Sequence, residues 1–269
     1  MDLQLAQDIA IVVGGAQGIG LAIAREFAAE GADVALLDRS DQVALASQAI
    51  RDQFGVRVLG HVCDATDDAS LSSAASWVLE AMGGWHHVVY AAGAGSGKYG
   101  FPFWNLTPSD WPRVLDINLT GAVRTAQAFV PRLTEQRRGS LLFLSSIAGQ
   151  IGSQTDPPYS AAKAGLINFA QCAAKDLAPF QVRVNTICPG MVQTAVNRSV
   201  WQAWYNQTPP EARLSYEEWA GDKVKRVAPL GRWQTAEDIA ALAVFLASPR
   251  AANITGQTMN VDGGQVMHW

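Results

Sequence analysis

A tyrosine and a lysine stand four positions apart, Tyr159 and Lys163, in a segment with helical character. Side chains four apart on a helix project from the same face, so a hydroxyl and an ammonium group can act on one point. Ser146 stands thirteen residues before the tyrosine, at the end of an apolar run that predicts a strand. The tyrosine–lysine spacing alone is weak evidence. The serine at a strand end makes coincidence remote, and we predict one site from the three.

These residue types suit the removal of a proton from an alcohol while a hydride leaves its carbon. A free tyrosine has a pKa near ~10, which is too high for a good base at neutral pH. A nearby positive charge favours the phenolate, and Lys163 would supply it. Ser146 would hydrogen-bond the substrate oxygen and hold it by Tyr159. Taken singly, a strand-end cap, a helix-start aromatic residue and a surface charge explain the three residues equally well.

A glycine-rich segment indicates where a second reactant would bind. It reads Gly14-Gly-Ala-Gln-Gly18-Ile-Gly20 and lies between an apolar strand and a helix. Glycines there let the backbone approach a pyrophosphate, which then meets the N-terminus of the helix. A glycine cluster alone can mark a structural turn, but its position in a strand–helix–strand unit favours dinucleotide binding.

Two neighbouring residues bear on the choice of dinucleotide. Asp38 ends the second predicted strand, 18 residues after Gly20. A carboxylate there can accept hydrogen bonds from the adenosine ribose, and it would repel the 2′-phosphate of NADP. Arg39 opposes this preference, because a guanidinium group pairs with phosphate. Gln17 adds no positive charge to the loop, and we expect Asp38 to make NAD the cofactor, with NADP less favoured.

Short β-branched runs alternate with amphipathic stretches, which predicts parallel strands joined by right-handed helical crossovers. Strands are expected at 9–13, 33–37, 56–59, 87–90, 140–144, 182–187 and 258–261. Helices are expected at 18–30, 41–54, 67–82, from 107 to about 136, at 158–178 and at 235–247. Thr107 and Thr235 each precede an aspartate by three residues, which is typical of a capping box. We predict one α/β domain over residues 1–269, a doubly wound Rossmann-type parallel sheet of about seven strands with helices on both faces.

The segment 192–230 breaks this alternation and is rich in tryptophan, proline and charged residues. An insertion of this length in a compact domain is usually functional. We expect a substrate lid that is mobile without cofactor and ordered with it, because closure excludes water from hydride transfer. Candidate pocket walls are the loop after Gly93, the stretch 152–158, and Met191, Trp201, Trp204 and Tyr205. The aromatic residues are equally suited to packing the lid itself or a subunit interface.

Composition excludes several classes of function. The net charge is −4 and no run of Lys and Arg exists, so no nucleic-acid partner is expected. No apolar run approaches the roughly 18 residues of a membrane span, and the first residues do not form a secretory signal, so we expect a cytoplasmic protein without a membrane partner. Neither the three cysteines nor the four histidines have the spacing of metal ligands, so no metal is expected.

The chain resembles the classical short-chain dehydrogenase/reductase family over essentially its whole length. The resemblance rests on the glycine loop, Asp64, Ala91-Ala-Gly93, Asn118-Leu-Thr-Gly121, Ser146, Tyr159-x-x-x-Lys163, Pro189-Gly190, Thr255-Gly-Gln and Asp262-Gly-Gly264. It implies a catalytic tetrad of Asn118, Ser146, Tyr159 and Lys163, in which Asn118 holds a water that links Lys163 to solvent.

The resemblance also implies which residues contact the cofactor. Lys163 would bind the nicotinamide ribose, and Val192 and Thr194 would lie near the carboxamide. The full set is Gly14, Gln17, Gly18, Ile19, Gly20, Asp38, Arg39, Asp64, Ala65, Ala91, Ala92, Gly93, Tyr159, Lys163, Pro189, Gly190, Val192 and Thr194. Two positions depart from the family pattern, since Val13 stands where Thr is frequent and Ala91 where Asn is frequent. Both family residues usually support loops by hydrogen bonds, so the departures concern rigidity near the cofactor.

These observations predict an NAD-dependent oxidoreductase that interconverts a secondary alcohol and a ketone, or a lactol and a lactone. The segment 255–267 resembles that of family members acting on sugars, polyols and sugar acids. One alternative is a reductase of cyclic or aliphatic ketones or of 3-oxoacyl thioesters, for which Lys223, Lys225 and Arg226 are the only hint. Another is a non-catalytic dinucleotide sensor, which an intact Ser146, Tyr159 and Lys163 disfavours.

The quaternary structure expected is a homotetramer. The charged fraction is 16%, against the usual share of roughly 25%. Apolar helix faces at 166–174 and 239–246, together with the family resemblance, favour a symmetric assembly.

Overall fold

The computed structural model describes residues 2–98, 103–152, 156–193 and 195–267, and in these residues it contains one sheet of seven strands. The strand order is β3-β2-β1-β4-β5-β6-β7, and every neighbouring pair is parallel. The strands are β1 (Ile9–Val13), β2 (Asp33–Asp38), β3 (Val58–Val62), β4 (His87–Tyr90), β5 (Gly139–Leu144), β6 (Val182–Pro189) and β7 (Thr258–Val261). The order reverses between β1 and β4, which is where ligands bind in sheets of this kind. The predicted doubly wound fold is confirmed.

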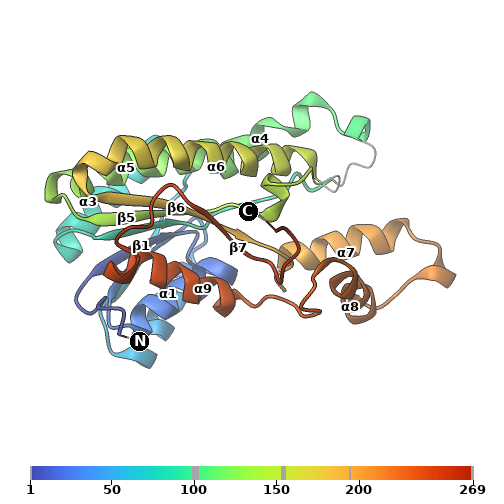
Figure 1. Cartoon of the computed structure of the whole chain (residues 1–269), viewed down its shortest axis with the longest axis horizontal. Helices are drawn as coiled ribbons and strands as arrows, with labels where there is room; N and C mark the ends of the chain where they lie inside the picture. The colour runs from blue at the N-terminus through green and yellow to red at the C-terminus, as the bar shows by residue number, and fades with distance from the viewer. Residues whose placement is uncertain (1, 99–102, 153–155, 194, 268–269) are drawn as a thin grey trace.

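Helices cover both faces of the sheet (Figure 1). The α-helices are α1 (Gly18–Ala29), α2 (Val43–Phe54), α3 (Asp68–Met82), α4 (Pro112–Leu115), α5 (Gly121–Gln136), α6 (Pro157–Leu177), α7 (Ala195–Gln207), α8 (Tyr216–Val227) and α9 (Ala236–Ala247). Short 3₁₀ turns are η1 (Phe103–Asn105), η2 (Pro108–Asp110), η4 (Ile147–Gly149), η5 (Ala178–Phe180), η6 (Pro210–Ala212) and η7 (Pro249–Ala251), and η3 (Asp116–Thr120) is a π-helical turn.

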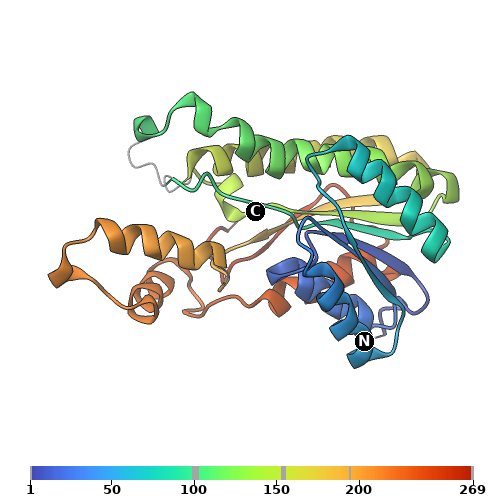
Figure 2. The same ribbon diagram turned by 180° about the vertical axis from the view of Figure 1, so that it is seen from behind.

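The two faces of the sheet build two separate cores. On β1, Ala10 and Val12 point into a core shared with α1, α2 and α9, while Ile9, Ile11 and Val13 point into a core shared with α3, α5 and α6. This follows from the two-residue period of a strand, which sends successive side chains to opposite faces. The views from both sides show α1 and α9 together on one face and α5 and α6 on the other (Figures 1 and 2). A strand buried on both faces reads as the continuous apolar run seen in the sequence.

The predicted bounds of the third strand were wrong. The third strand was expected at 56–59 but spans Val58–Val62, because the pairing with β2 begins at Val34 and Val58. The main-chain amide of Arg57, just before it, donates to the Asp33 side chain at 2.9 Å instead of joining the ladder. The helices expected from 107 to about 136 are η2, α4, η3 and α5. Pro108 and Pro112 each lack an amide hydrogen, so helices begin at these positions and do not run through them.

Both predicted capping boxes are present. The Thr107–Asp110 pair opens η2 and the Thr235–Asp238 pair opens α9. The segment 192–230 is not irregular throughout, because it contains α7 and α8, which project from one end of the sheet (Figures 1 and 2). We call α7 and α8 with the turn between them the arm.

The aromatic residues of the arm pack largely on one another. The Trp201 ring lies 5.2 Å from the ring of Tyr205 and 5.8 Å from that of Tyr216, and Trp204 lies 6.2 Å from Trp219. Capping by Ser215 and Glu218 fixes the start of α8. Of the roles open from the sequence, packing of the arm itself is therefore the one observed for Trp201, Trp204 and Tyr205.

Candidate active site

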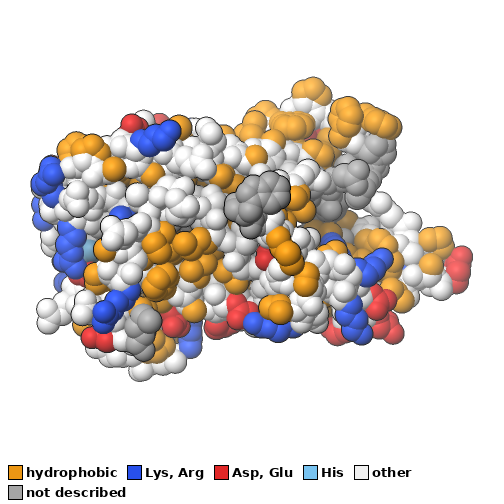
Figure 3. All heavy atoms as spheres, viewed as in Figure 1, with side chains coloured by type: hydrophobic (Ala, Val, Ile, Leu, Met, Phe, Trp, Pro, Cys, Tyr) orange, Lys and Arg blue, Asp and Glu red, His pale blue; other side chains and the backbone are white. Residues whose placement is uncertain are grey.

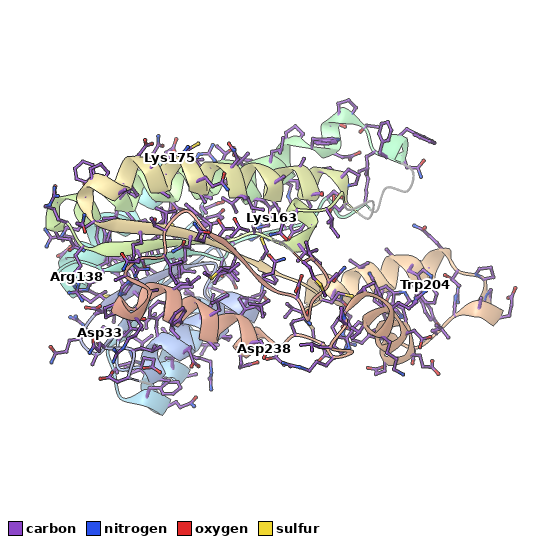
Figure 4. All side chains as sticks on the ribbon, viewed as in Figure 1. Asp33, Arg138, Lys163, Lys175, Trp204 and Asp238 are labelled. Carbon is purple, nitrogen blue, oxygen red and sulfur yellow. The ribbon has the colours of Figure 1, made fainter. Side chains whose placement is uncertain are left out.

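Parallel strands bring their carboxyl ends to one edge of the sheet, and the predicted chemical residues follow these ends. Ser146 follows β5, the loop from Ala91 follows β4, and Pro189 closes β6. Helix α6 passes over the same edge and carries Tyr159 and Lys163 in its first two turns. In Figure 4 the Lys163 side chain lies between α6 and the strand ends. The fold therefore assembles the three residues on which the sequence analysis began.

The serine and the tyrosine are in direct contact. The Ser146 side chain caps η4 by accepting from the amide of Ala148 at 3.1 Å, which fixes its position after β5. Burial raises the pKa of Tyr159 to about 12, and the hydrogen bond between its hydroxyl and Ser146 opposes this rise. A buried phenol of this kind needs a nearby cation before it can act as a base.

Lys163 is the cation next to that phenol. Its side chain is 2% exposed, its Nζ lies 5.4 Å from the centroid of the Tyr159 ring, and it donates to the Leu144 carbonyl at 2.7 Å. Burial lowers the pKa of Lys163 to about 8, so the ammonium form still predominates at neutral pH. None of the ion pairs among the residues that the structure describes includes Lys163. Its charge therefore remains available to a phenolate or to a bound ligand.

Asn118 is held beside this pair by the π-helical turn η3. It is fully buried, and its Nδ2 donates to the carbonyls of Ala94 at 2.7 Å and Val114 at 2.9 Å. Its Oδ1 is buried and has no hydrogen-bond partner within the described part of the chain. A Cβ placed on Gly93 would lie 3.0 Å from that oxygen and 3.5 Å from Lys163 Nζ, so both groups face the same loop residue. All four tetrad residues thus belong to one neighbourhood.

The glycine loop has the shape required to hold a dinucleotide. Gly14 has a φ of +83°, and a Cβ there would lie 2.6 Å from the Ala92 amide nitrogen, so no larger residue fits. Helix α1 has no side-chain cap from Gln17 and no acidic residue in its first turn. The free amides at its N-terminus are those that bind phosphate groups. The residues present therefore fit a pyrophosphate at this end of α1.

Asp38 lies at the other side of the same loop. Its Oδ2 accepts from the Ala16 amide at 3.0 Å and its Oδ1 from the Ser40 amide at 3.0 Å. The carboxylate thus fixes the glycine loop as well as facing the place predicted for the ribose. Arg39 is exposed. Hydrogen bonds from Thr66 are the main cause of the lowered pKa of Asp64, and the charge of Arg39 contributes to it.

The remaining residues that are predicted to contact the cofactor lie along the same edge of the sheet, at the carboxyl ends of the strands. The Gly190 amide donates to the Val261 carbonyl at 2.9 Å, and the buried Val192 forms an isolated parallel β-bridge with Gln234. The two departures from the family pattern are joined by their main chains, since the Ala91 amide donates to the Val13 carbonyl at 2.8 Å. Thr194 lies outside the described residues. The others stand at the start of α1 or directly after β3 and β4: Gln17, Gly18, Ile19, Gly20, Ala65 and Ala92.

Two residues beside the tetrad were not singled out from the sequence, although Asp156 lies in the stretch 152–158 that was predicted as a pocket wall. Asp156 directly precedes α6, is 6% exposed, and accepts from the Ser96 amide at 2.8 Å. Burial raises its pKa, and hydrogen bonds from Ser96 and from the Tyr159 amide oppose the rise. It is the only charged residue of the stretch 150–158, which was a signal. Cys188 is buried beside Ser145, and burial raises its pKa to about 11, so it is a thiol; nothing in the sequence marked it.

The described residues contain neither a metal-ligand cluster nor a membrane-spanning helix. No cluster of His, Cys, Asp and Glu has the arrangement of a metal site among them. No helix in the described part of the chain has both the length and the apolar character needed to span a membrane.

Comparison with known proteins places the chain in a family. A family model described as enoyl-(acyl carrier protein) reductase matches residues 14–266. An uncharacterised short-chain type dehydrogenase/reductase of Sinorhizobium fredii is 33% identical over 264 residues, covering 96% of this chain and 97% of the relative. The chain belongs to the short-chain dehydrogenase/reductase family.

Two other proteins to which the chain is similar act on hydroxyl-rich compounds, by their names. A D-threitol dehydrogenase of Mycolicibacterium smegmatis is 34% identical over 265 residues, covering 98% of this chain and 94% of the relative. The structure of L-sorbose reductase from Gluconobacter frateurii, complexed with NADPH and L-sorbose, has a TM-score of 0.91 at 28% identity and covers both chains fully. The resemblance found in the sequence is confirmed, and the chain is an oxidoreductase of this family.

Proposed function

We propose that this oxidoreductase interconverts a secondary alcohol and a ketone, or a lactol and a lactone, by hydride transfer with NAD, and that its substrate is a sugar, a polyol or a sugar acid. The observation that carries the reaction type is the contact of Tyr159 with Ser146 beside the buried ammonium group of Lys163. These are the groups needed to hold an alcohol oxygen and to take its proton.

The protein's own residues divide the proton chemistry among them. A bound nicotinamide ring would accept the hydride in oxidation and return it in reduction. Ser146 hydrogen-bonds the substrate oxygen and Tyr159 takes its proton. Lys163, whose ammonium group lies beside the Tyr159 ring, stabilises the phenolate, since a nearby positive charge favours the ionised form. The free Oδ1 of Asn118, beside Lys163, is placed to hold the water that passes the proton to solvent.

Cofactor and substrate rest on separate observations. The Asp38 carboxylate supports NAD, because it is fixed beside the glycine loop and would repel a 2′-phosphate. The structure of the related L-sorbose reductase contains NADPH, so similarity to this relative does not support the preference for NAD over NADP. The names of the D-threitol and L-sorbose relatives support a hydroxyl-rich substrate.

A second candidate function is reduction of a cyclic or aliphatic ketone or of a 3-oxoacyl thioester. The matched family model, described as enoyl-(acyl carrier protein) reductase, favours an acyl thioester as the substrate. An acyl carrier would require free cations near the entrance; Lys223 lies 4.8 Å over the ring of Trp219 within the arm, while Lys225 and Arg226 are exposed. A non-catalytic dinucleotide sensor has no need of the contact between Tyr159 and Ser146.

We also infer a homotetramer and closure of the segment 192–230 over bound cofactor. Apolar side chains gather over α9 in Figure 3, and Phe103 and Trp104 are 67% and 70% exposed. Exposed apolar surface of this kind marks contacts between subunits. Closure is supported by the position of the arm directly after Pro189, at the carboxyl end of β6.

The test is turnover on a panel of sugars, polyols, simple ketones and a 3-oxoacyl thioester, each with both cofactors, followed by the absorbance of the reduced nicotinamide. We expect the highest kcat/KM on a hydroxyl-rich substrate with NAD. Preference for the thioester would establish the second candidate. Cofactor binding without turnover on any member would favour the sensor.

A further inference from the structure

A buried carboxylate without a complete set of donors stands next to the tetrad. Asp156 occupies the N-cap position of α6, three residues before Tyr159, and is 6% exposed. The negative charge of Asp156 contributes to the raised pKa of the Tyr159 hydroxyl and so opposes its ionisation. The proposed chemistry makes no use of this charge, and a carboxylate that disfavours the phenolate requires another reason to be there.

The position of the carboxylate is fixed by the loop after β4. Oδ2 accepts from the Ser96 amide at 2.8 Å, while Asn118 holds the same loop through the Ala94 carbonyl at 2.7 Å. A Cβ on Gly95 would lie 2.8 Å from Oδ2, so the absence of a side chain there admits the carboxylate. The loop that carries Gly93 is thus held by a tetrad residue on one side and by Asp156 on the other.

The second oxygen of this carboxylate is the unexplained atom. Oδ1 is buried, and although Ser96 and the Tyr159 amide lie close enough to lower the pKa of this carboxyl, no described residue donates to Oδ1 with hydrogen-bond geometry. A buried charged acceptor left unpaired is costly, so it requires an explanation, and a ligand that completes its hydrogen bonding is one. A carboxylate only accepts hydrogen bonds, so the ligand must bring a donor.

We propose that Asp156 is a specificity-determining residue whose Oδ1 accepts a hydrogen bond from a second hydroxyl of the substrate, beside the reacting carbon. This proposal rests on the proposed function and narrows its substrate class to compounds with neighbouring oxygens, such as vicinal diols and hydroxyketones. A 3-oxoacyl thioester brings only a carbonyl acceptor near its ketone. The carboxylate would leave that acceptor unpaired and repel it, which discriminates strongly between otherwise similar substrates.

The experiment compares ketones that differ by one group. Acetoin carries a hydroxyl beside its ketone, butanone carries none, and diacetyl carries a carbonyl acceptor. Their reduction is measured with wild type, Asp156→Asn, Asp156→Ala and the control Asp176→Asn, which removes an exposed carboxylate near the far end of the same helix. In Asp156→Asn the amide oxygen can still accept from Ser96, while the amide nitrogen replaces Oδ1 with a donor.

We expect wild type to prefer acetoin to butanone by about tenfold or more in kcat/KM, the usual effect of a hydrogen bond to a charged group. Both Asp156 variants should lose this preference, mainly through KM. Asp156→Asn should also raise the rate on diacetyl relative to butanone, and Asp176→Asn should behave as wild type. Thermal unfolding midpoints verify that each variant is folded.

Two results would overturn this inference without affecting the proposed function. One is equal activity of wild type on acetoin and butanone, which leaves the proposed oxidoreductase intact. The other is an equal loss on all three ketones in folded Asp156 variants, which would make Asp156 a support of the loop only. Absence of wild-type turnover on these ketones and on the whole substrate panel would overturn the proposed function and this inference together.

Discussion

Replacing Asp38 by asparagine should weaken the preference of the enzyme for NAD over NADP. The carboxylate is held by the Ala16 and Ser40 amides, each at 3.0 Å, so it cannot easily rotate away from a 2′-phosphate. At about 4 Å, two such charges repel by on the order of 4 kcal/mol at an effective dielectric near 20. If screening leaves a third to a half of this, the preference for NAD is roughly ten- to thirtyfold.

Asparagine removes the charge but keeps one acceptor for the loop. The lost acceptor should cost about 1 kcal/mol of stability with either cofactor, so the ratio of the two kcat/KM values isolates the electrostatic effect. Arg39→Gln is the matched control, because it removes the opposing charge and should raise the NAD preference. The assay measures kcat/KM for NAD and NADP in the three proteins. A wild type that favours NADP, or an unchanged ratio in Asp38→Asn, would refute the reasoning and assign the choice to Arg39.

Three further predictions address stability, proton transfer and assembly. His87 is buried, and burial lowers its pKa, so below about pH 6.5 the unfolded chain binds a proton that the folded chain excludes. The free energy of unfolding should therefore fall, as the pH decreases, by up to about 1.4 kcal/mol per pH unit for this group. A denaturant titration that shows no fall between pH 6.5 and 5 would contradict this. Asn118→Ala should lower kcat about tenfold or more and leave NAD affinity within a few fold, as measured by kinetics and fluorescence titration; unchanged kcat would remove Asn118 from the proton path. Sedimentation at micromolar concentration should give a tetramer, and a stable monomer would overturn that assignment.

The sequence was sufficient to predict the fold because the strands are buried on both faces and their apolar runs are unbroken. It was less informative where prolines and side-chain caps decide the local path. Val56 and Arg57 have strand-like composition, yet the Arg57 amide donates to the Asp33 side chain, and only the Arg57 carbonyl bonds to β2, through the Val34 amide. Pro108 and Pro112 are the positions where η2 and α4 begin, within a segment for which the sequence predicts helices without their exact bounds.

The site was predictable to the extent that its residues form linear patterns. Tyr159 and Lys163 lie on one helix face, and Ser146 ends a strand, so spacing alone brings them near each other. Asp156 contacts Ser96, sixty residues away in the sequence, and only the fold brings the two together. Asp38 also supports the glycine loop by accepting a hydrogen bond from the Ala16 amide, in addition to its predicted role at the ribose. This contact is not predicted by spacing in the sequence.

The substitution Tyr159→Phe tests the central claim most directly. It removes one hydroxyl from a ring whose packing is otherwise preserved, so the fold and the NAD affinity should survive, as checked by thermal unfolding and by titration with NAD. Turnover on the best substrate of the panel should fall by about 10²–10⁴-fold, the usual contribution of a general acid or base. Ser146 and Lys163 cannot replace the lost base, since a serine hydroxyl is a far weaker acid and Lys163 is held at the Leu144 carbonyl. A folded variant that binds NAD and keeps most of its activity across the pH range would contradict the mechanism.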